Sequence, residues 1–301
     1  MSKGQYSTGR KEEQGIMAEN SKIEWTDHTF NPWSGCQRVS PGCQHCYAET
    51  MAKRNPQTLG VWGPTGTRVR TSAANWRKPL LWNKQAQAGG RRFRVFCASM
   101  ADVFERRDEL IPWRAELMVL IQSTPNLDWL LLTKRPENIL DMVPWTWHMN
   151  RPNMITNDLV SGGGAWPSNV WIGTSVENQE QAQKRIPELL KVPAAVRFLS
   201  CEPLLGPVNL ELIPDALYDA GMPFEWNKLN GDERGIKWVI AGAESGHGAR
   251  PMSIDWVRGL RNQCQGAGVP FFFKQMLVNG KKVGLPELDG QQWVQMPEVT
   301  A

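Results

Sequence analysis

Six short apolar runs, rich in β-branched and aromatic residues, recur along the chain and constrain its fold more than any other feature. Each is almost continuously hydrophobic, which is typical of parallel strands covered on both faces. The runs are "RFRVFCAS" at 92–99, "LDWLLLT" at 127–133, "NVWIGTS" at 169–175, "VRFLSC" at 196–201, "IKWVIAG" at 236–242 and "VPFFFK" at 269–274. Helical patterns lie between them, and this alternation predicts βαβ units around a parallel sheet.

Three of the intervening segments are predicted helices. Residues 111–122 carry a proline early and apolar residues on one side. Residues 178–191 are amphipathic but contain Pro187, which predicts a kink or a break there. A third helix is expected to start after the N-cap residue Ser253 and to stop at Gly266. With a first strand in "HTFNPWSG" at 28–35, the strand number favours a full or partial barrel over an open sheet.

The chain of 301 residues is long enough to bury a large core, and no linker or internal repeat divides it. Residues 1–20 are polar and without periodicity, so we expect a flexible N-terminal arm. The folded region is expected at 21–285, with a C-terminal tail at 286–301. Two long segments rich in Gly, Pro and Asn, 141–168 and 214–235, are expected to be loop insertions of the kind that form lids or stay disordered.

No apolar run reaches the roughly 18–20 residues that cross a bilayer, and the polar N-terminus lacks the apolar core of a signal peptide. We therefore expect a cytoplasmic protein with no membrane partner. The net charge of +4 permits a phosphate-bearing partner without requiring one, because a solvated surface with a small basic excess looks the same. In a reducing compartment, cysteines more often serve metals or catalysis than disulfides.

Polar and ionisable residues follow the apolar runs. In a parallel α/β barrel the C-terminal strand ends meet on one face, where active sites lie. We expect these side chains to form a pocket for a polar, charged ligand, although each residue alone could simply be a solvated turn. They are Ser99, Asp102, Thr133, Lys134, Arg135, Ser175, Glu177, Ser200, Glu202, Glu244, Ser245, His247, Arg250, Lys274 and Gln275. The chain has no GxGxxG or GxxxxGK[ST] motif, which disfavours a Rossmann or P-loop nucleotide fold.

Three of the six cysteines, Cys36, Cys43 and Cys46, lie close together on a turn-rich loop after the predicted first strand. A zinc site would need a fourth ligand, and the nearest candidate, His45, lies cramped between two of the cysteines. The more distant candidates for that ligand are His28, His148, His247 and Cys201. An iron–sulfur cluster is the other reading, in which three thiolates leave one iron open to a substrate or cofactor. Cys97, in a strand, and Cys264, in a helix, are expected to be buried and inert.

Four stretches of the chain resemble a phage-associated family with a three-cysteine motif. They are "IEWTDHTFNPWSGCQRVSPGCQHCYAE", "FLSCEPLLGP", "WVIAGAESGHGARPM" and "VPFFFKQ". That family is grouped with the radical S-adenosylmethionine enzymes, near spore photoproduct lyase. The resemblance implies an α/β fold, a partial TIM-type (β/α)6 barrel with loop insertions, and a [4Fe–4S] cluster after the first strand. The six residues between Cys36 and Cys43, and His45 in place of an aromatic before Cys46, depart from the common CxxxCxxC spacing.

The resemblance also implies roles for individual residues. The thiolates of Cys36, Cys43 and Cys46 would bind three irons, and S-adenosylmethionine would bind the fourth. Reduction by an electron donor of the flavodoxin or ferredoxin type would cleave this cofactor to a 5′-deoxyadenosyl radical. The residues implied to hold the cofactor are Ser99, Asp102, Ser175, Glu177 and Tyr47.

The implied substrate is a DNA base or a nucleotide, thymine-derived, that the enzyme modifies or rearranges in a phage-infected bacterial host. Lys134, Arg135 and Gln275 would bind it. Lys274, Glu202 and Glu244 would act in catalysis, although Lys274 and Glu202 could merely pair with each other across the barrel. Two alternatives stay open: a radical enzyme acting on a small metabolite or peptide, and a zinc-bearing nucleic-acid-binding protein without catalysis.

Overall fold

The computed structural model describes residues 21, 23–147, 166–213, 235–246 and 248–298. The expected N-terminal arm, residues 1–20, lies outside these residues. So does most of each expected insertion, 141–168 and 214–235. No helix among the described residues is long and apolar enough to cross a membrane.

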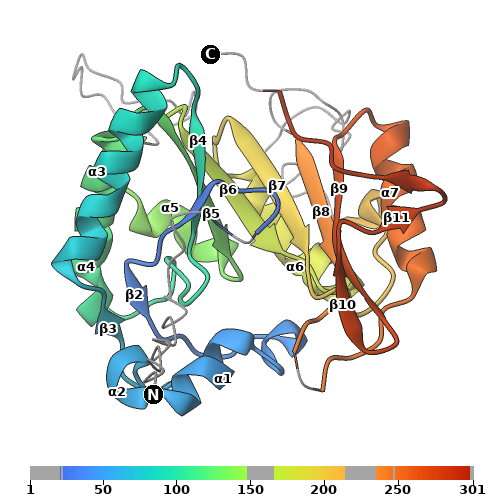
Figure 1. The fold of residues 1–301 in the computed structure, drawn as a ribbon, viewed down its shortest axis with the longest axis horizontal. Coiled ribbons are helices and arrows are strands. Elements are labelled where there is room, and N and C mark those ends of the chain that lie inside the picture. Colours follow the sequence, from blue (N-terminus) through green and yellow to red (C-terminus); the bar gives the residue numbers. More distant parts are fainter. Residues whose placement is uncertain (1–20, 22, 148–165, 214–234, 247, 299–301) are drawn as a thin grey trace, which may run out of the picture.

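An eight-stranded sheet forms the centre of the molecule and curls around a buried interior (Figure 1). Its strands from β1 to β9 pair in parallel, and β10 is antiparallel to β9. In spatial order they are β1 (His28–Thr29), β4 (Phe93–Cys97), β5 (Leu127–Thr133), β6 (Val170–Ser175), β7 (Val196–Cys201), β8 (Trp238–Gly242), β9 (Phe271–Val278) and β10 (Lys281–Gly284). Each predicted run contains one strand, and the curled sheet is a partial TIM-like architecture, as expected.

The predicted first strand is much shorter than "HTFNPWSG". Only β1 joins the sheet, while β2 (Trp33–Ser34) leaves it and pairs antiparallel with β3 (Val69–Arg70). Pro32 cannot donate a ladder hydrogen bond, which ends the pairing with β4. Gly35 then turns with φ +109°, where a Cβ would lie 2.7 Å from the Thr67 carbonyl oxygen. This turn brings the cysteines that follow to the carboxyl ends of the strands.

Helices α3 and α4 lie on one flank of the curl and α7 on the other, while α1 and α2 lie beside the carboxyl ends of the strands (Figure 1). The helices are α1 (Tyr47–Arg54), α2 (Pro56–Leu59), α3 (Ala73–Ala88), α4 (Ile111–Gln122), α5 (Ile139–Met142), α6 (Gln179–Leu190) and α7 (Ile254–Gly266). Short 3-10 turns lie at Pro41–Cys43, Asp108–Leu110, Pro136–Asn138, Trp145–Trp147 and Leu210–Leu212. Helix α4 matches its prediction, and α7 starts where Ser253 caps the backbone N–H of Asp255.

Helix α6 runs past Pro187 to Leu190, so the predicted break is wrong. The proline is itself buried with Ala182, Ile186 and Leu189 on the inner side of the helix. Most helical stability in proteins comes from packing such an apolar face. That packing offsets the one backbone hydrogen bond that Pro187 cannot donate. Helix α3, which was not predicted, also contains a proline, Pro79.

Side chains alternate between two apolar layers, which explains the unbroken hydrophobic runs. In β5, Leu127, Trp129 and Leu131 pack in the cluster that the outer helices cover. Leu130 instead joins an inner cluster with Phe96 and other large side chains from neighbouring strands. This period-2 alternation places apolar groups on both faces of each strand.

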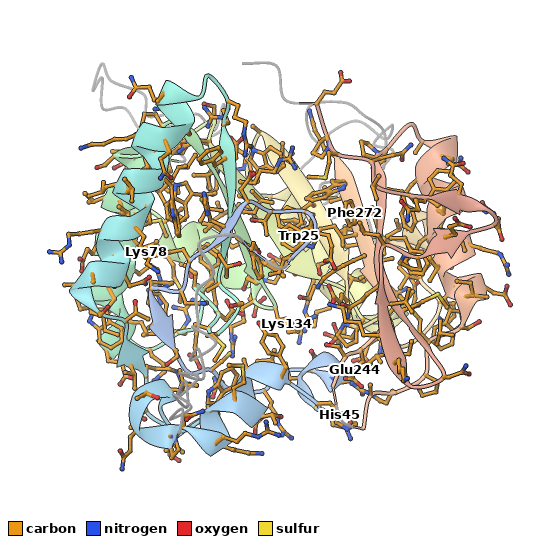
Figure 2. All side chains as sticks on the ribbon, viewed as in Figure 1. Trp25, His45, Lys78, Lys134, Glu244 and Phe272 are labelled. Carbon is orange, nitrogen blue, oxygen red and sulfur yellow. The ribbon has the colours of Figure 1, made fainter. Side chains whose placement is uncertain are left out.

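The inner cluster is aromatic, and the segment before β1 plugs it. The Trp25 ring lies 5.0 Å from Phe96 and 5.8 Å from Trp238, both edge-on. Trp238 in turn contacts Phe272 at 6.1 Å between ring centroids. Figure 2 shows Trp25 and Phe272 inside the curl. The interior of this half-barrel is therefore a packed core.

Residues beyond 285, where a tail was expected, contain a small hairpin of β11 (Glu287–Leu288) and β12 (Gln291–Gln292). After the hairpin, Val294 forms an antiparallel bridge with Phe272 of β9. Trp293 is 5% exposed and packs against Phe271. The described end of the chain thus covers the start of β9.

Substitution of Gly173 tests the packing of the inner layer. A Cβ at this position would lie 2.3–2.6 Å from three ring carbons of Phe198, its neighbour in β7. We expect Gly173→Ala to lower the free energy of unfolding by about 1–3 kcal/mol, as overpacking of a core does. Denaturant titration followed by circular dichroism measures it.

Gly259, in the interior of α7, is the matched control because a Cβ there would meet nothing within 4 Å. Gly259→Ala should raise stability by about 0.5–1 kcal/mol, the usual gain in a helix. A Gly173→Ala protein as stable as the wild type would contradict the close packing of Phe198 on β6.

Candidate functional site

A cavity opens at the carboxyl ends of the parallel strands, between them and the loop that carries the clustered cysteines. In Figure 2, Lys134, Glu244 and His45 lie on this side of the molecule. Of the residues assigned to metal, cofactor, substrate or catalysis, all but Glu177 and Gln275 line the cavity, and of the other strand-end residues Thr133, Ser200 and Ser245 line it while Arg250 does not. The assigned residues that line it are Cys36, Cys43, Cys46, Tyr47, Ser99, Asp102, Lys134, Arg135, Ser175, Glu202, Glu244 and Lys274. The strand-end residues and the cysteines therefore lie on the same face of the molecule.

The three cysteines are free and partly exposed, and each contributes to the cavity wall. Cys43 ends the 3-10 turn at 41–43, and Cys46 is the N-cap residue of α1. Backbone N–H groups of Ala48 and Glu49, in the first turn of α1, donate to the Cys46 sulfur. Within the part of the chain that the structure describes, no three His, Cys, Asp or Glu side chains are grouped closely enough to share one metal ion. Thiolates are ligands of both zinc and iron–sulfur clusters.

Two of the other candidate zinc ligands, His28 and Cys201, lie apart from these thiols. His28 stacks on Trp82 at 4.2 Å, and Cys201 is fully buried at the end of β7; neither lines the cavity. His148 and His247 lie outside the described residues. Cys97 and Cys264 are fully buried, as expected.

Burial raises the pKa of the Cys36 thiol to about 12, and the nearby carboxylates of Asp102 and Glu105 raise it further against the opposing charge of Arg135. Burial likewise raises the pKa of Cys46, although the two helix N–H groups oppose it. Without a metal, both side chains are therefore protonated at neutral pH. Metal binding at this loop has to displace those protons.

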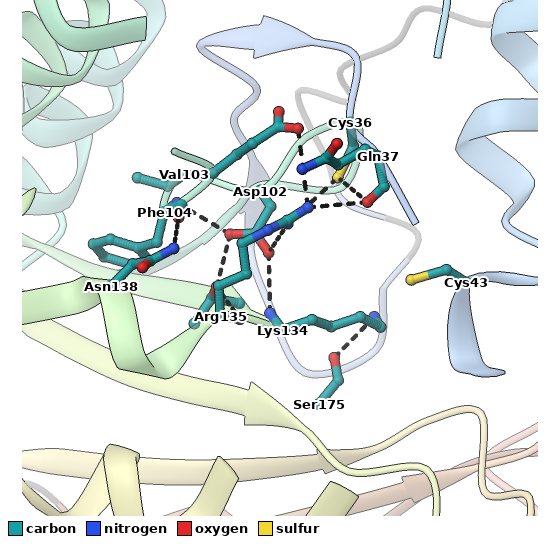
Figure 3. Close-up of polar contacts among 12 residues, drawn as sticks. Cys36, Gln37, Cys43, Asp102, Val103, Phe104, Lys134, Arg135, Asn138 and Ser175 are labelled. Carbon is teal, nitrogen blue, oxygen red and sulfur yellow. Dashed lines mark hydrogen bonds and ion pairs between the residues drawn. The ribbon is translucent and has the colours of Figure 1, made fainter. Parts of the chain in front are cut away.

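Arg135 holds the start of the cysteine loop. Its Nη1 donates to Asp102 Oδ2 at 2.9 Å and contacts Cys36 Sγ at 3.7 Å, and its Nη2 donates to the Gln37 carbonyl oxygen at 3.0 Å (Figure 3). Burial raises the pKa of Asp102, but Arg135 and hydrogen bonds from Thr133 and two backbone N–H groups outweigh it and lower this pKa. Arg135 and Asp102, predicted to bind substrate and cofactor, thus form a buried pair that positions Cys36.

Glu177 holds the middle of the loop from β6. Its Oε1 accepts from the backbone N–H of Gly42 at 3.1 Å, and its Oε2 accepts from Arg185 Nη1 at 2.8 Å. Burial raises the pKa of Glu177, but Arg185, the Ser40 hydroxyl and other groups outweigh it and lower this pKa. A Cβ on Gly42 would lie 3.0 Å from the carboxylate, so the backbone approaches as closely as it does because residue 42 is glycine.

Glu244 and Arg250, which follow β8, hold the end of the loop. Arg250 Nε and backbone N–H both donate to Glu244 Oε2 at 2.9 Å. Arg250 also donates to the Pro41 carbonyl oxygen at 3.0 Å and to Gln44 Oε1 at 3.2 Å. His45 Nδ1 lies 3.2 Å from Glu244 Oε2. Glu244, predicted to be catalytic, is therefore engaged by the arginine and by the loop.

Two polar pairs remain that face the cavity and do not hold the cysteine loop. Lys274 Nζ donates to both carboxylate oxygens of Glu202, at 2.7 and 2.8 Å, so these residues pair across the barrel as one reading of the sequence allowed. Lys134 Nζ donates to the Ser175 hydroxyl at 3.1 Å. Both pairs are part-buried, and both offer donors to a ligand.

Ser99 and Tyr47 meet at the cavity mouth. The Tyr47 hydroxyl donates to the Ser99 carbonyl oxygen at 2.9 Å, which ties α1 to the end of β4. The Ser99 hydroxyl is within hydrogen-bond distance of the Asn31 side chain. Gln275 is buried away from the cavity, where its Nε2 donates to the Ala243 carbonyl oxygen at 2.7 Å.

The sequence reasoning missed Arg185 and Asn31. Arg185 lies on the buried side of α6, and a charged residue on the apolar face of an amphipathic helix was the available signal. Asn31 accepts from the backbone N–H of Met100 at 2.8 Å and so joins the start of the chain to the loop after β4. Nothing in its spacing pointed to that partner.

Comparison with known proteins gives one family match and two similar structures. A family model described as "Protein of unknown function (DUF5131)" matches residues 20–297. No curated protein matches the chain. Two solved mutant forms of spore photoproduct lyase resemble the fold with TM-scores of 0.44 and 0.45, at 12% and 10% identity. The likeness covers 82% and 84% of this chain but 63% and 64% of those chains, so this chain spans less than two thirds of their length.

Glu177→Gln tests the hold on the middle of the cysteine loop. The substitution leaves Arg185, whose side chain is 3% exposed, without its charged partner. We expect a loss of about 3 kcal/mol in the free energy of unfolding near pH 7, as for other broken buried pairs. Urea titrations of both proteins at a series of pH values measure it.

The same titrations give a pH dependence. Because folding lowers the pKa of Glu177 below its ordinary 4.5, its contribution is present above pH 4.5 and is lost as the pH falls through the folded-state value. The difference in the free energy of unfolding between wild type and Glu177→Gln should therefore shrink as the pH falls below 4.5. Glu180→Gln, at an exposed position in the same helix, is the control and should change stability by less than about 0.5 kcal/mol. A constant difference at all pH values would contradict the ion pair.

Proposed function

The chain belongs to the DUF5131 family, and we propose that it binds a [4Fe–4S] cluster through Cys36, Cys43 and Cys46 and cleaves S-adenosylmethionine reductively. One observation carries this proposal. The three thiols of one loop line one cavity at the strand ends, and among the described residues no fourth cysteine lines it. Three thiolates would leave one iron of a four-iron cluster open to the cofactor. A flavodoxin- or ferredoxin-type partner would supply the electron.

When bound, the cluster and S-adenosylmethionine would supply one-electron chemistry that can break an unactivated C–H bond. The chain's own contribution is to bind, orient and shield. The Lys134 ammonium group donates to a hydroxyl, that of Ser175, so its charge is available to the carboxylate of a cofactor or to an anionic substrate. The Ser99 and Ser200 hydroxyls line the same cavity and suit the polar groups of such a ligand.

Lys274 and Glu202 are our candidates for acting on the substrate. Their pair presents an ammonium donor and a carboxylate acceptor side by side, with side chains 13% and 18% exposed to the cavity side. Such a pair can orient a ligand that has both an acceptor and a donor, and it can hold a proton at Lys274 Nζ. We assign Glu244 to the cysteine loop instead, because Arg250 and His45 already engage it.

The proposed substrate is a DNA base or a nucleotide. The inner wall of the cavity includes Trp25, Phe96 and Leu132, which would keep water from a reacting carbon and suit a flat ring. The family resemblance read from the cysteine loop and the "AGAESGHGAR" segment favours a thymine-derived base in a phage setting.

Removal of single cysteines tests the cluster. We expect Cys36→Ala, Cys43→Ala and Cys46→Ala each to lose S-adenosylmethionine cleavage and most of the bound iron and sulfide after anaerobic reconstitution, because each removes one of three ligands. Cys264→Ala, buried in α7, is the control and should keep both. Colourless wild-type protein with stoichiometric zinc and no sulfide would instead establish the zinc-bearing alternative.

Nucleoside analysis tests the substrate. Reduced, reconstituted protein with S-adenosylmethionine is incubated with phage DNA carrying modified thymines, and the digested nucleosides are separated by mass spectrometry. We expect a change of mass or retention time in a thymine-derived nucleoside, and no change with Cys43→Ala protein. Unchanged nucleosides, together with conversion of an amino acid or peptide offered in parallel, would favour a small-molecule or peptide substrate.

A further inference from the structure

The guanidinium group of Arg135 is shared between a carboxylate and a cysteine sulfur (Figure 3). Nη1 lies 2.9 Å from Asp102 Oδ2 and 3.7 Å from Cys36 Sγ, and Nη2 binds the Gln37 carbonyl oxygen. The Arg135 side chain is 6% exposed. A planar guanidinium presents several N–H donors in a fixed fork, so one side chain can serve all three acceptors at once.

Other buried charges surround Arg135. Arg68 and Glu105 form a fully buried pair at 2.6 Å, and Glu105 lies 3.9 Å from Arg135 Nη2. Arg114 is also buried and donates to the Val103 and Glu105 carbonyl oxygens. Three arginines thus lie near two carboxylates, Asp102 and Glu105. A thiolate at Cys36 adds a further negative charge to this group, and Arg135 is the cation that contacts it.

Arg250 also donates to a backbone carbonyl oxygen of the cysteine loop, but it has no contact with a cysteine sulfur among the described residues. Arg250 binds Glu244, the Pro41 carbonyl oxygen and Gln44. Its described partners are all oxygen atoms, whereas Arg135 also reaches sulfur. The two arginines therefore share the task of holding the loop and differ in their access to a thiolate.

We propose that Arg135 is a positioning residue that donates a hydrogen bond to the Cys36 thiolate and raises the reduction potential of the bound cluster. This inference rests on the proposed function. Reduction adds one electron and therefore one negative charge, and N–H donors to the sulfurs favour the more negative state. Charge-assisted hydrogen bonds are stronger than neutral ones. A single guanidinium donor should therefore raise the reduction potential more than a single neutral N–H donor would.

The test compares two variants in one background. Arg135→Gln alone would leave the Asp102 carboxylate buried without its partner, so Asp102→Asn serves as the reference, and the double variant Asp102→Asn/Arg135→Gln removes the sulfur contact. Each protein is reconstituted with iron and sulfide and titrated with dithionite, and electron paramagnetic resonance follows the reduced cluster. We expect the midpoint potential of the double variant to lie ~59 mV below that of Asp102→Asn. For a one-electron couple this shift lowers the ratio of reduced to oxidised cluster about tenfold at a given potential.

Arg91→Gln removes an exposed arginine beside the amino-terminal end of β4, away from the cavity, and is the control that should leave the midpoint potential at the wild-type value. Equal midpoints for Asp102→Asn and the double variant, at equal iron and sulfide content, would overturn the role of Arg135 and leave the cluster itself intact. If the double variant fails to fold by circular dichroism, Asp102→Asn/Arg135→Met carries the test, because methionine fills part of the same space and has no N–H donor for Cys36. An unchanged midpoint there overturns the role as well. Wild-type protein that takes up no iron and sulfide would instead refute the proposed function.

Discussion

Three carboxylate–arginine pairs hold the cysteine loop against the strand ends, and the candidate site depends on them. The pairs are Asp102 with Arg135, Glu177 with Arg185, and Glu244 with Arg250, and their carboxylates follow three different strands, β4, β6 and β8. Their side chains are largely or fully buried, where charges are costly unless paired and hydrogen-bonded. Each pair gives its remaining donors or acceptors to the loop. The loop that carries the thiols is therefore ordered by the barrel rather than by its own turns.

This arrangement shows that the charged side chains at the strand ends have different roles. A charged side chain at a barrel rim can bind a ligand or position another part of the chain, and residue type does not distinguish these roles. Here Asp102, Arg135, Glu177 and Glu244 are occupied by the cysteine loop or by each other. Lys134, Glu202 and Lys274 remain facing the cavity. The polar part of the cavity is thus smaller and more specific than the ring of residues suggests, and its inner wall is aromatic.

The curled sheet makes both features possible. Each central strand presents apolar side chains outward to the helices and inward to the Trp25 cluster. A few paired polar side chains, such as Asp128 in β5 and Arg197 in β7, lie within the strands, but most of the cavity's polar residues lie where the strands end. The close approach of Gly42 to Glu177, and the turn at Gly35, then bring the loop over this edge.

The sequence by itself determined the strands, the main helices and the shared location of cysteines and strand-end residues, because hydrophobic period and parallel topology are local or general properties. The boundaries of β5 and α4 follow from it to the residue. The loop's partners were decided only by tertiary structure, since Arg135 and Cys36 are 99 residues apart, Gly42 and Glu177 135, and Arg250 and Pro41 209. The path of α6 through Pro187 was likewise decided by packing, whereas the early exit of the first strand follows from Pro32, and only the pairing of β2 with β3 required the tertiary structure. A sequence pattern identifies a charged residue at a strand end, but its role depends on which distant backbone the fold brings within hydrogen-bond reach.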